Sequence, residues 1–531
     1  MSLLSIHDLS VSIYGMQVLD RVSLQVTSGN IHGIIGESGS GKSISALSVM
    51  RLLPRGATAS GKIAFEGRDL LALGEGAMCA IRGNQIGMVF QEPMTALNPV
   101  QTIGAQVAET ILQHEKCSRR DAMEQAQATL DRVGLAGDGV GMHRYPHELS
   151  GGQRQRVVIA SAIARRPKLL IADEPTTALD VTTQAQILRL IRKLVDEDGM
   201  GALFITHDLA VVSGIADDIS IMRKGQVVET GATADVFAHM RHPYTRALFE
   251  ASSHQPDRLA VPAETALLEV QNLTRTYPVR GAFLNPKPDF VAVKNVSFTL
   301  RRGESLGLVG ESGCGKSTLT RAILGLEASQ GGSIAIDGDN VTLPVSRGTR
   351  TKMQVVFQDP YGSFNPRHKV ARLVSEPFHL LDEPPTGAAR QTAIAEALES
   401  VGLSHTDADK YIHEFSGGQR QRIAIARALI IKPKLIILDE AVSALDVSIR
   451  AQILDLLADL SGRFGLSYLF ISHDLHVVRR ITDRVLVMKA GEIVESGATN
   501  DVFTNPQHAY TAELIAAAPT LEGGTVPLSP Q

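Results

Sequence analysis

An eight-residue stretch that occurs twice constrains this chain more than any other feature. GESGSGKS covers residues 36–43, and GESGCGKS covers residues 310–317. Both fit the pattern G-x-x-x-x-G-K-[ST], and each follows an apolar run, 31–35 or 306–309, and opens a helical pattern. In such a strand–loop–helix, the glycines let successive backbone N–H groups point inward and form an anion site at the helix N-terminus. The two stretches therefore predict two sites for a nucleoside triphosphate.

The last two residues of each phosphate loop carry the expected chemistry. Lys42 and Lys316 are expected to reach the β- and γ-phosphates, and the hydroxyls of Ser43 and Ser317 to ligate Mg²⁺. The predicted ATP-binding residues of the first loop and the position after it are Gly36, Glu37, Ser38, Gly39, Ser40, Gly41, Lys42, Ser43 and Ile44. Those of the second are Gly310, Glu311, Ser312, Gly313, Cys314, Gly315, Lys316, Ser317 and Thr318.

Two differences between the loops are visible in the sequence. Ile44 stands where the second copy has Thr318, so the first loop lacks one hydroxyl near the phosphates but keeps the backbone donor. Cys314 stands where the first copy has Ser40. Because a helix N-terminus favours a thiolate, we expect this cysteine to be reactive and its alkylation to block ATP.

Length and composition limit the class of protein. A chain of 531 residues is too long for one hydrophobic core. It has 44% hydrophobic residues, 20% charged residues and a net charge of −4, which argues against a nucleic-acid binder. No apolar run reaches the roughly 18 residues that span a bilayer, the N-terminus lacks a signal-peptide pattern, and three cysteines make no disulfide framework. We therefore expect a cytoplasmic protein.

The chain resolves into two similar halves of about 265 residues. Lys316 lies 274 positions after Lys42, and Ser416 lies 266 positions after Ser150, so the halves align with short insertions. One insertion is the Pro/Gly-rich VRGAFLNPKPDF of the second half. The join is polar and contains proline, as linkers do. We predict one domain over 1–250, a linker over 251–266 and a second domain over 267–531.

Within each half, short apolar strands alternate with helical patterns, which predicts an α/β fold with a mainly parallel sheet. A largely helical segment, from QTIGAQVAETILQHEK to LDRVG in the first half, is expected to be an insertion in this core. The closing stretches HPYTRALFEA and QHAYTAELIAAA are expected to be helical.

KLLIADEP and KLIILDEA are apolar strands that end in an acidic pair. Asp173 and Asp439 are placed to hold Mg²⁺ through water, and Glu174 and Glu440 to polarise the attacking water. The similar LLDEPP at 380–385 lacks a long preceding apolar strand, so we expect a loop there.

LSGGQRQR and FSGGQRQR, here called the signature stretches, predict a second anion site in each half. Each combines an N-capping serine with two glycines at the start of an apolar-periodic helix. The residues are Ser150, Gly151, Gly152 and Gln153, and Ser416, Gly417, Gly418 and Gln419. Because each half already has a phosphate loop, we expect the signature stretch to cap the ATP of the other half.

With these motifs together, the chain closely resembles the ATPase subunits of ABC transporters over nearly all of both halves. The resemblance implies two tandem P-loop NTPase domains, each with a mainly parallel core, an inserted helical subdomain and an antiparallel β-subdomain. It also implies residue roles in matched pairs. Tyr14 and Tyr277 would stack on adenine, and Gln91 and Gln358 would sense Mg²⁺ and touch the membrane subunit. Asp180 and Asp446 would lie in the loop that crosses between the domains, and His207 and His473 would contact the γ-phosphate.

FQEPMTALNP, FQDPYGSFNP and the two closing stretches resemble the oligopeptide/dipeptide importer ATPases. The whole resembles both subunits of that family fused in one chain, as in microcin-C-type peptide importers and in glutathione importers. The resemblance implies ATP and Mg²⁺ as ligands, two integral membrane permease subunits, an external substrate-binding protein, and a peripheral place on the inner face of the cell membrane. No nucleic-acid partner is expected.

Three departures from the family pattern leave the reacting groups in place: Ile44, Phe415 for the usual leucine, and Ala441 for the usual proline. We therefore expect two active sites. No cysteine follows Cys314, so no iron–sulfur cluster is expected. Glutathione, nickel or sugar as cargo, an exporter, and an ABC protein acting on ribosomes or DNA remain alternatives.

Overall fold

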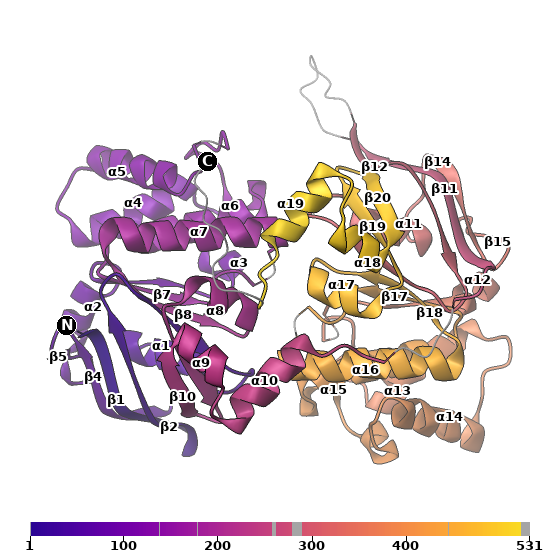
Figure 1. The fold of residues 1–531 in the computed structure, drawn as a ribbon, viewed down its shortest axis with the longest axis horizontal. Coiled ribbons are helices and arrows are strands. Elements are labelled where there is room, and N and C mark those ends of the chain that lie inside the picture. The colour runs from indigo at the N-terminus through magenta and orange to yellow at the C-terminus, as the bar shows by residue number, and fades with distance from the viewer. Residues whose placement is uncertain are drawn as a thin grey trace. The chain divides into compact units, whose positions relative to one another are not determined.

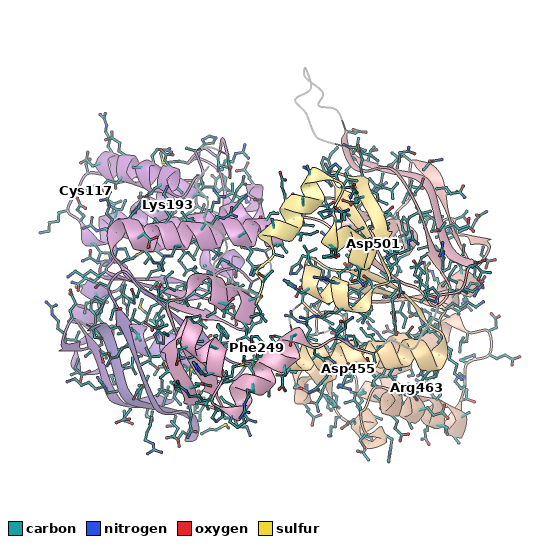
Figure 2. The ribbon with its side chains drawn as sticks, in the orientation of Figure 1. Cys117, Lys193, Phe249, Asp455, Arg463 and Asp501 are labelled. Carbon is teal, nitrogen blue, oxygen red and sulfur yellow. The ribbon has the colours of Figure 1, made fainter. Side chains whose placement is uncertain are left out.

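In the computed structural model, the chain folds into two units of the same architecture (Figure 1). The described residues are 2–136, 138–177, 179–257, 262–278, 289–359, 361–443 and 445–521. Residues up to Ser253 form nearly all of one unit, and residues from His254 onward form nearly all of the other. The stretch 251–266 begins within α10 (Pro243–Ser253) and ends on the first residue of β11 (Ala266–Tyr277). Residues 258–261, most of the second-half insertion at 279–288, and the last ten residues lie outside the described part.

Each unit has a small antiparallel sheet. In the first unit its order is β2 (Met16–Thr27), β1 (Ser2–Ile13), β4 (Ala57–Phe65) and β5 (Arg68–Asp69). In the second unit it is β12 (Phe290–Arg301), β11, β14 (Gly331–Ile336) and β15 (Asp339–Asn340). One face is apolar, as expected for an antiparallel sheet that covers a core on one side. Leu4 and Ile6 are fully buried on that face in β1.

The central sheet of each unit has six strands. Its order in the first unit is β10 (Gln226–Ala232), β9 (Asp218–Arg223), β3 (Ile31–Ile35), β8 (Gly201–Thr206), β7 (Leu169–Asp173) and β6 (Ile86–Val89). In the second it is β16 (Met353–Val356), β17 (Leu435–Asp439), β18 (Ser467–Ile471), β13 (Ser305–Val309), β19 (Arg484–Lys489) and β20 (Glu492–Ala498). All neighbours are parallel except the last hairpin of each unit. The prediction of a mainly parallel sheet is therefore confirmed.

One hydrophobic cluster of each unit lies between its two sheets. In the first unit, buried side chains of β1 and β4 pack with Ile34 and Leu203 of the central sheet and with Ala46 and Val49 of α1 (Lys42–Met50). An equivalent cluster in the second unit includes Leu319 of α11 (Lys316–Ile323). This packing fixes the helix that follows each phosphate loop against the sheet.

The inserted segment is helical in both units, as predicted. It contains α4 (Ile103–His114) and α5 (Arg119–Arg132) in the first, and α13 (Val370–Val374) and α14 (Gly387–Ser400) in the second. The helices of the signature stretches, α6 (Gly151–Ile163) and α15 (Gly417–Leu429), follow it. Ser118 and Asp121 form a capping box at the start of α5. LLDEPP holds no strand; apart from Leu380, which ends a short 3₁₀ helix, it is irregular, so the loop prediction is confirmed.

The remaining helices connect and flank the sheets. In the first unit they are α2 (Glu75–Ile81), α3 (Pro93–Ala96), α7 (Val181–Asp198), α8 (Leu209–Ile215), α9 (Thr233–His239) and α10. In the second they are α12 (Arg347–Lys352), α16 (Val447–Phe464), α17 (Leu475–Ile481), α18 (Thr499–Thr504) and α19 (Ala509–Ala517). Both closing stretches are helical, as predicted. Among the described helices, none combines the length and the apolar character that a membrane crossing requires.

Candidate nucleotide sites

The sheet topology brings the predicted residues of each half to one edge. β3, β8, β7 and β6 are parallel neighbours, so their carboxyl ends lie together. The phosphate loop follows β3, His207 follows β8, the acidic pair ends β7, and Gln91 follows β6. The second half repeats this arrangement with β13, β18, β17 and β16. In open α/β sheets, ligands bind at this edge.

The first glycine of each phosphate loop is required by a close backbone approach. A Cβ on Gly36 would lie 2.3 Å from the Met222 carbonyl oxygen, and one on Gly310 would lie 2.2 Å from that of Met488. Gly41 has φ 102°, which side-chain-bearing residues rarely adopt. The loop therefore passes close to β9 in the first half and to β19 in the second.

The phosphate-loop lysine of each half lies inside its own loop. Lys42 is only 6% exposed, and its Nζ donates to the carbonyl oxygens of Gly36 at 2.7 Å and Glu37 at 2.9 Å. Lys316 makes the equivalent bonds to the second loop at 2.6 and 2.8 Å. A phosphate in the loop offers this ammonium a charged acceptor, which makes a stronger bond than a neutral carbonyl.

A serine hydroxyl and a buried carboxylate face each other beside the first loop. Ser43 Oγ donates to Asp173 Oδ1 at 3.1 Å. Burial raises the pKa of Asp173 to about 6, reinforced by the negative charge of Glu174 and opposed by the bond from Ser43 and the charge of Lys42. A nearby cation would stabilise the ionised form of this buried carboxyl group. Hydroxyl and carboxylate oxygens are suitable ligands for Mg²⁺.

The second half lacks one of these contacts. Burial also raises the pKa of Asp439, with the negative charge of Glu440 in the same sense. Within the described part of the chain, however, Ser317 makes no hydrogen bond to Asp439. The two halves thus share the buried carboxylate, but among the described residues only the first half pairs it with a serine hydroxyl.

The carboxylate of Glu174 lies within hydrogen-bonding distance of three side chains. Its carboxylate accepts hydrogen bonds from Gln91 Nε2 and Thr177 Oγ1, both at 2.9 Å, and lies 3.2 Å from His207 Nδ1. Burial acts to raise the pKa of this carboxyl, but the His207 and Thr177 bonds and nearby positive charge outweigh it and lower the pKa to about 2. Its backbone N–H donates to Ile205, which ties the turn after β7 to β8. Glu174 is therefore ionised at neutral pH.

The equivalent group in the second half is less enclosed. Glu440 Oε2 lies 3.3 Å from His473 Nδ1, and this histidine lowers the pKa of the carboxyl against the effect of burial. Gln358 is exposed and, among the described residues, donates no hydrogen bond to Glu440. The side chain of Ser443, at the position of Thr177, donates instead to the Glu440 backbone carbonyl. The sequence motifs did not predict a role for Thr177, although its position three residues after Glu174 could have indicated this contact.

Each signature stretch starts a helix through a capping box. Ser150 Oγ accepts from the Gln153 N–H at 3.3 Å, and Gln153 Oε1 accepts from the Ser150 N–H at 3.1 Å. Ser416 and Gln419 repeat this pair. The predicted serine N-caps are confirmed, and the glutamine proves to be the partner that completes them.

The tyrosines named by family resemblance have different surroundings in the two halves, whereas the aspartates stand at equivalent positions. Tyr14 is 82% exposed in the turn between β1 and β2, with its ring against Gly56. Tyr277 is partly buried, donates its hydroxyl to Glu327, and has Arg275 4.6 Å from its ring centroid. Asp180 immediately precedes α7, and Asp446 is the N-cap residue of α16.

The expectation of a reactive Cys314 is wrong. The side chain is 6% exposed, and burial raises the pKa of its thiol, although Lys316 nearby opposes the shift. The helix N-terminus and the lysine do not compensate for desolvation, so the thiol stays protonated. Ser40, its counterpart, is buried as well.

Comparison with known proteins agrees with this geometry. A family model described as "ABC transporter" matches residues 19–177 and 293–443, and one described as "Oligopeptide/dipeptide transporter, C-terminal region" matches residues 228–274 and 494–529.

Three curated relatives match along almost the whole chain. The peptidoglycan transport ATP-binding protein YejF of Agrobacterium fabrum is 46% identical, covering 98% of this chain and 97% of that protein. The glutathione import ATP-binding protein GsiA of Escherichia coli K12 is 48% identical, covering 94% of this chain and 86% of that protein. The uncharacterized ABC transporter ATP-binding protein YejF of the same strain is 47% identical, covering 97% and 99%.

Proposed function

The chain belongs to the ABC transporter family, in the group with the oligopeptide/dipeptide transporter C-terminal region, and from this premise we propose that it energises a peptide importer. It is an ATP-binding protein that hydrolyses ATP to drive transport. The observation that carries the proposal is the presence of that C-terminal region in both halves, at 228–274 and 494–529.

We assign the reacting groups by their geometry in the first half. Lys42 leaves its own loop carbonyls and binds the β- and γ-phosphates. Glu174, ionised and held by donors from Gln91, Thr177 and His207, accepts a hydrogen bond from the attacking water and orients it. His207 also contacts the γ-phosphate. Lys316, Glu440 and His473 act in the same way in the second half.

Mg²⁺ fits the oxygen donors that each site provides. Ser43 and Asp173 would hold it in the first half, with Ser317 and Asp439 in the second and the glutamines Gln91 and Gln358 nearby. When bound, it supplies positive charge to the phosphates. Within the described residues there is no group of three His, Cys, Asp or Glu side chains arranged for a metal, so phosphates and waters would complete the coordination.

The two halves are proposed to close head-to-tail on two nucleotides. The signature stretch of each half would cap the ATP in the phosphate loop of the other, with Asp180 and Asp446 in the crossing loops and Tyr14 and Tyr277 against the adenines. Closure would be passed through the loops of Gln91 and Gln358 to two permease subunits. The protein would then lie on the cytoplasmic face of the membrane, with an external binding protein delivering cargo.

A specific observation favours glutathione as a second candidate for the transported cargo. The relative named for glutathione import is 48% identical over nearly the whole chain, close to the value of the relative named for peptidoglycan transport. Glutathione is itself a tripeptide, so the two candidates share a chemistry. Nickel or sugar import, export, and action on ribosomes or DNA have no comparable support.

Uptake in a deletion strain tests the proposal. Loss of the gene should abolish accumulation of one or more labelled short peptides, and the wild-type gene should restore it. The double variant Glu174→Gln/Glu440→Gln, which keeps side-chain size, should be expressed but fail to restore uptake. Normal uptake of all peptides together with lost glutathione uptake would select the second candidate, and normal uptake of both would refute the importer assignment.

A further inference from the structure

The closing segment of each half folds back onto its own phosphate loop. In the first half, the N–H of Glu37, the second residue of the loop, donates to the hydroxyl oxygen of Tyr244 at 3.4 Å. In the second half, the N–H of Glu311 donates to the hydroxyl oxygen of Tyr510 at 3.1 Å. These tyrosines belong to α10 and α19, about two hundred residues further along the chain, and the same contact is made independently in each half.

A hydrogen-bonded turn fixes each tyrosine in place. In the first half, Glu229 of β10 accepts from the backbone N–H groups of Arg241 at 2.9 Å and His242 at 3.1 Å, and it also accepts from the Thr245 hydroxyl. His242 Nδ1 in turn accepts from the N–H of Tyr244 at 3.1 Å. The start of α10 is therefore anchored by Glu229 of β10 and by His242 of the turn.

The second half repeats this turn. Glu495 of β20 accepts from the N–H groups of Gln507 at 2.8 Å and His508 at 3.1 Å, and His508 Nδ1 accepts from the N–H of Tyr510 at 3.1 Å. The duplicated His-Pro-Tyr and His-Ala-Tyr stretches thus have a shared structural result, which is a tyrosine hydroxyl at the entry of the phosphate loop.

Both tyrosine rings are held from the sheet side as well. Arg223 lies 4.8 Å from the centroid of the Tyr244 ring, and Lys489 lies 4.5 Å from that of Tyr510. Tyr244 is 7% exposed and Tyr510 is 3% exposed. Burial, with the negative charge of Glu37, raises the pKa of Tyr244 to about 12, so its hydroxyl remains neutral at physiological pH.

We propose that Tyr244 and Tyr510 are positioning residues for ATP, each holding the first turn of its phosphate loop in the shape that receives the phosphates. Two successive peptide groups at Glu37 are held: its N–H donates to the Tyr244 hydroxyl, and its carbonyl accepts from Lys42. When the lysine turns to the phosphates, the bond to the carbonyl is lost, whereas the tyrosine bond to the N–H persists. The tyrosine therefore keeps the free loop in the shape that the phosphates require. Without its hydroxyl, a smaller share of the free loops would have that shape, and the apparent affinity for ATP would fall by the same factor.

This inference rests on the proposed role of the phosphate loops and gives the oligopeptide/dipeptide C-terminal region a part in nucleotide binding. Substituting Tyr244→Phe and Tyr510→Phe together removes only the hydroxyls and keeps the rings in their pockets. In the full chain, steady-state hydrolysis should show a KM for ATP raised about threefold to tenfold, as expected for one ordinary hydrogen bond, with kcat within about twofold of wild type.

A matched control is available in the second half. Tyr468 is also buried, and its hydroxyl donates to the Leu457 carbonyl at 3.0 Å, far along the strand from the phosphate-loop edge. Tyr468→Phe makes the same chemical change and should leave the KM for ATP unchanged, whatever it does to the unfolding temperature. A KM effect shared by the control would show a general loss of order and overturn the proposal.

Other outcomes are equally decisive. An unchanged KM in the double tyrosine variant, or a loss confined to kcat, would overturn the positioning role while leaving ATP binding by the loops intact. Failure of the wild-type chain to bind ATP would instead refute the proposed function itself. If the double variant does not fold, the single variants Tyr244→Phe and Tyr510→Phe should each weaken ATP binding at one of two sites in calorimetric titration, and two unchanged affinities would contradict the proposal.

Discussion

Asp173 is a single residue that suits the proposed Mg²⁺ site but lowers the stability of the folded chain at neutral pH. Its pKa of about 6 lies above the ordinary 3.8, because burial disfavours the charged form. Stability from this group is therefore fully present below about pH 3.8 and is lost as pH rises through 6. At neutral pH the ionised carboxylate costs the folded state free energy, on the order of 3 kcal/mol at most.

Asp173→Asn should therefore raise the unfolding temperature of the nucleotide-free chain at pH 8 and have little effect at pH 4. The amide can still accept the bond from Ser43, so the local geometry is kept. Thermal unfolding in the presence of a chelator measures this. Added Mg²⁺ and ATP should stabilise the wild type more than the variant. A variant less stable than the wild type at pH 8 without metal would contradict the argument.

Residue identities were more predictable than residue environments. Lysine, serine, aspartate, glutamate and histidine were expected to gather because they follow neighbouring parallel strands, and the structure brings them together. The state of Cys314 was predicted wrongly, because burial is set by residues distant in sequence. The sequence also could not show that Gln91 would donate to Glu174 while Gln358, among the described residues, makes no such bond to Glu440, since loop conformation decides this.

At the scale of elements, each signature helix depends on one particular glycine. A Cβ on Gly152 would lie 2.3 Å from Thr183 Cγ2 at the start of α7, and one on Gly418 would lie 2.5 Å from Ile449 Cγ2 in α16. The preceding glycines have room: a Cβ on Gly151 would meet nothing nearer than 3.6 Å, and one on Gly417 nothing within 4 Å. The second glycine therefore permits close helix packing.

Gly152→Ala and Gly418→Ala should each destabilise the protein by about 1–3 kcal/mol, the usual cost of overpacking against a stiff branched side chain. Gly151→Ala and Gly417→Ala are the matched controls and should stay within about 0.5 kcal/mol, because alanine meets open space there. Thermal unfolding of the four variants checks this. Equal loss of stability at both positions of a pair would show that backbone conformation, and not helix packing, requires the glycines.

Elements were predicted well where the local pattern and the tertiary environment agree. The fully buried strands β3 and β7 appear in the sequence as continuous apolar runs, and the helices after the signature stretches begin at a recognisable serine. The turn before α10 was not predictable in its role, because its anchor, Glu229, and its target, Glu37, come from other parts of the chain.

At the scale of the whole molecule, duplication within one chain changes how the sites assemble. Each half has its own two sheets, helical insertion and closing segment, and the relatives that match along almost the full length are single chains too. If nucleotides are sandwiched between halves, both halves are already tethered. A short linker gives an effective concentration on the order of mM, far above that of a protein in solution.

Hydrolysis by the wild-type chain should therefore have a specific activity that is unchanged over about a thousandfold dilution, because no second molecule is needed to complete a site. The Glu174→Gln/Glu440→Gln variant should bind ATP, fail to hydrolyse it, and keep the mass of one chain in light scattering both with and without ATP. The nucleotide-free variant is the matched control for that comparison. An ATP-dependent doubling of mass, or activity that falls on dilution, would mean that the halves pair between molecules and would exclude closure within one chain.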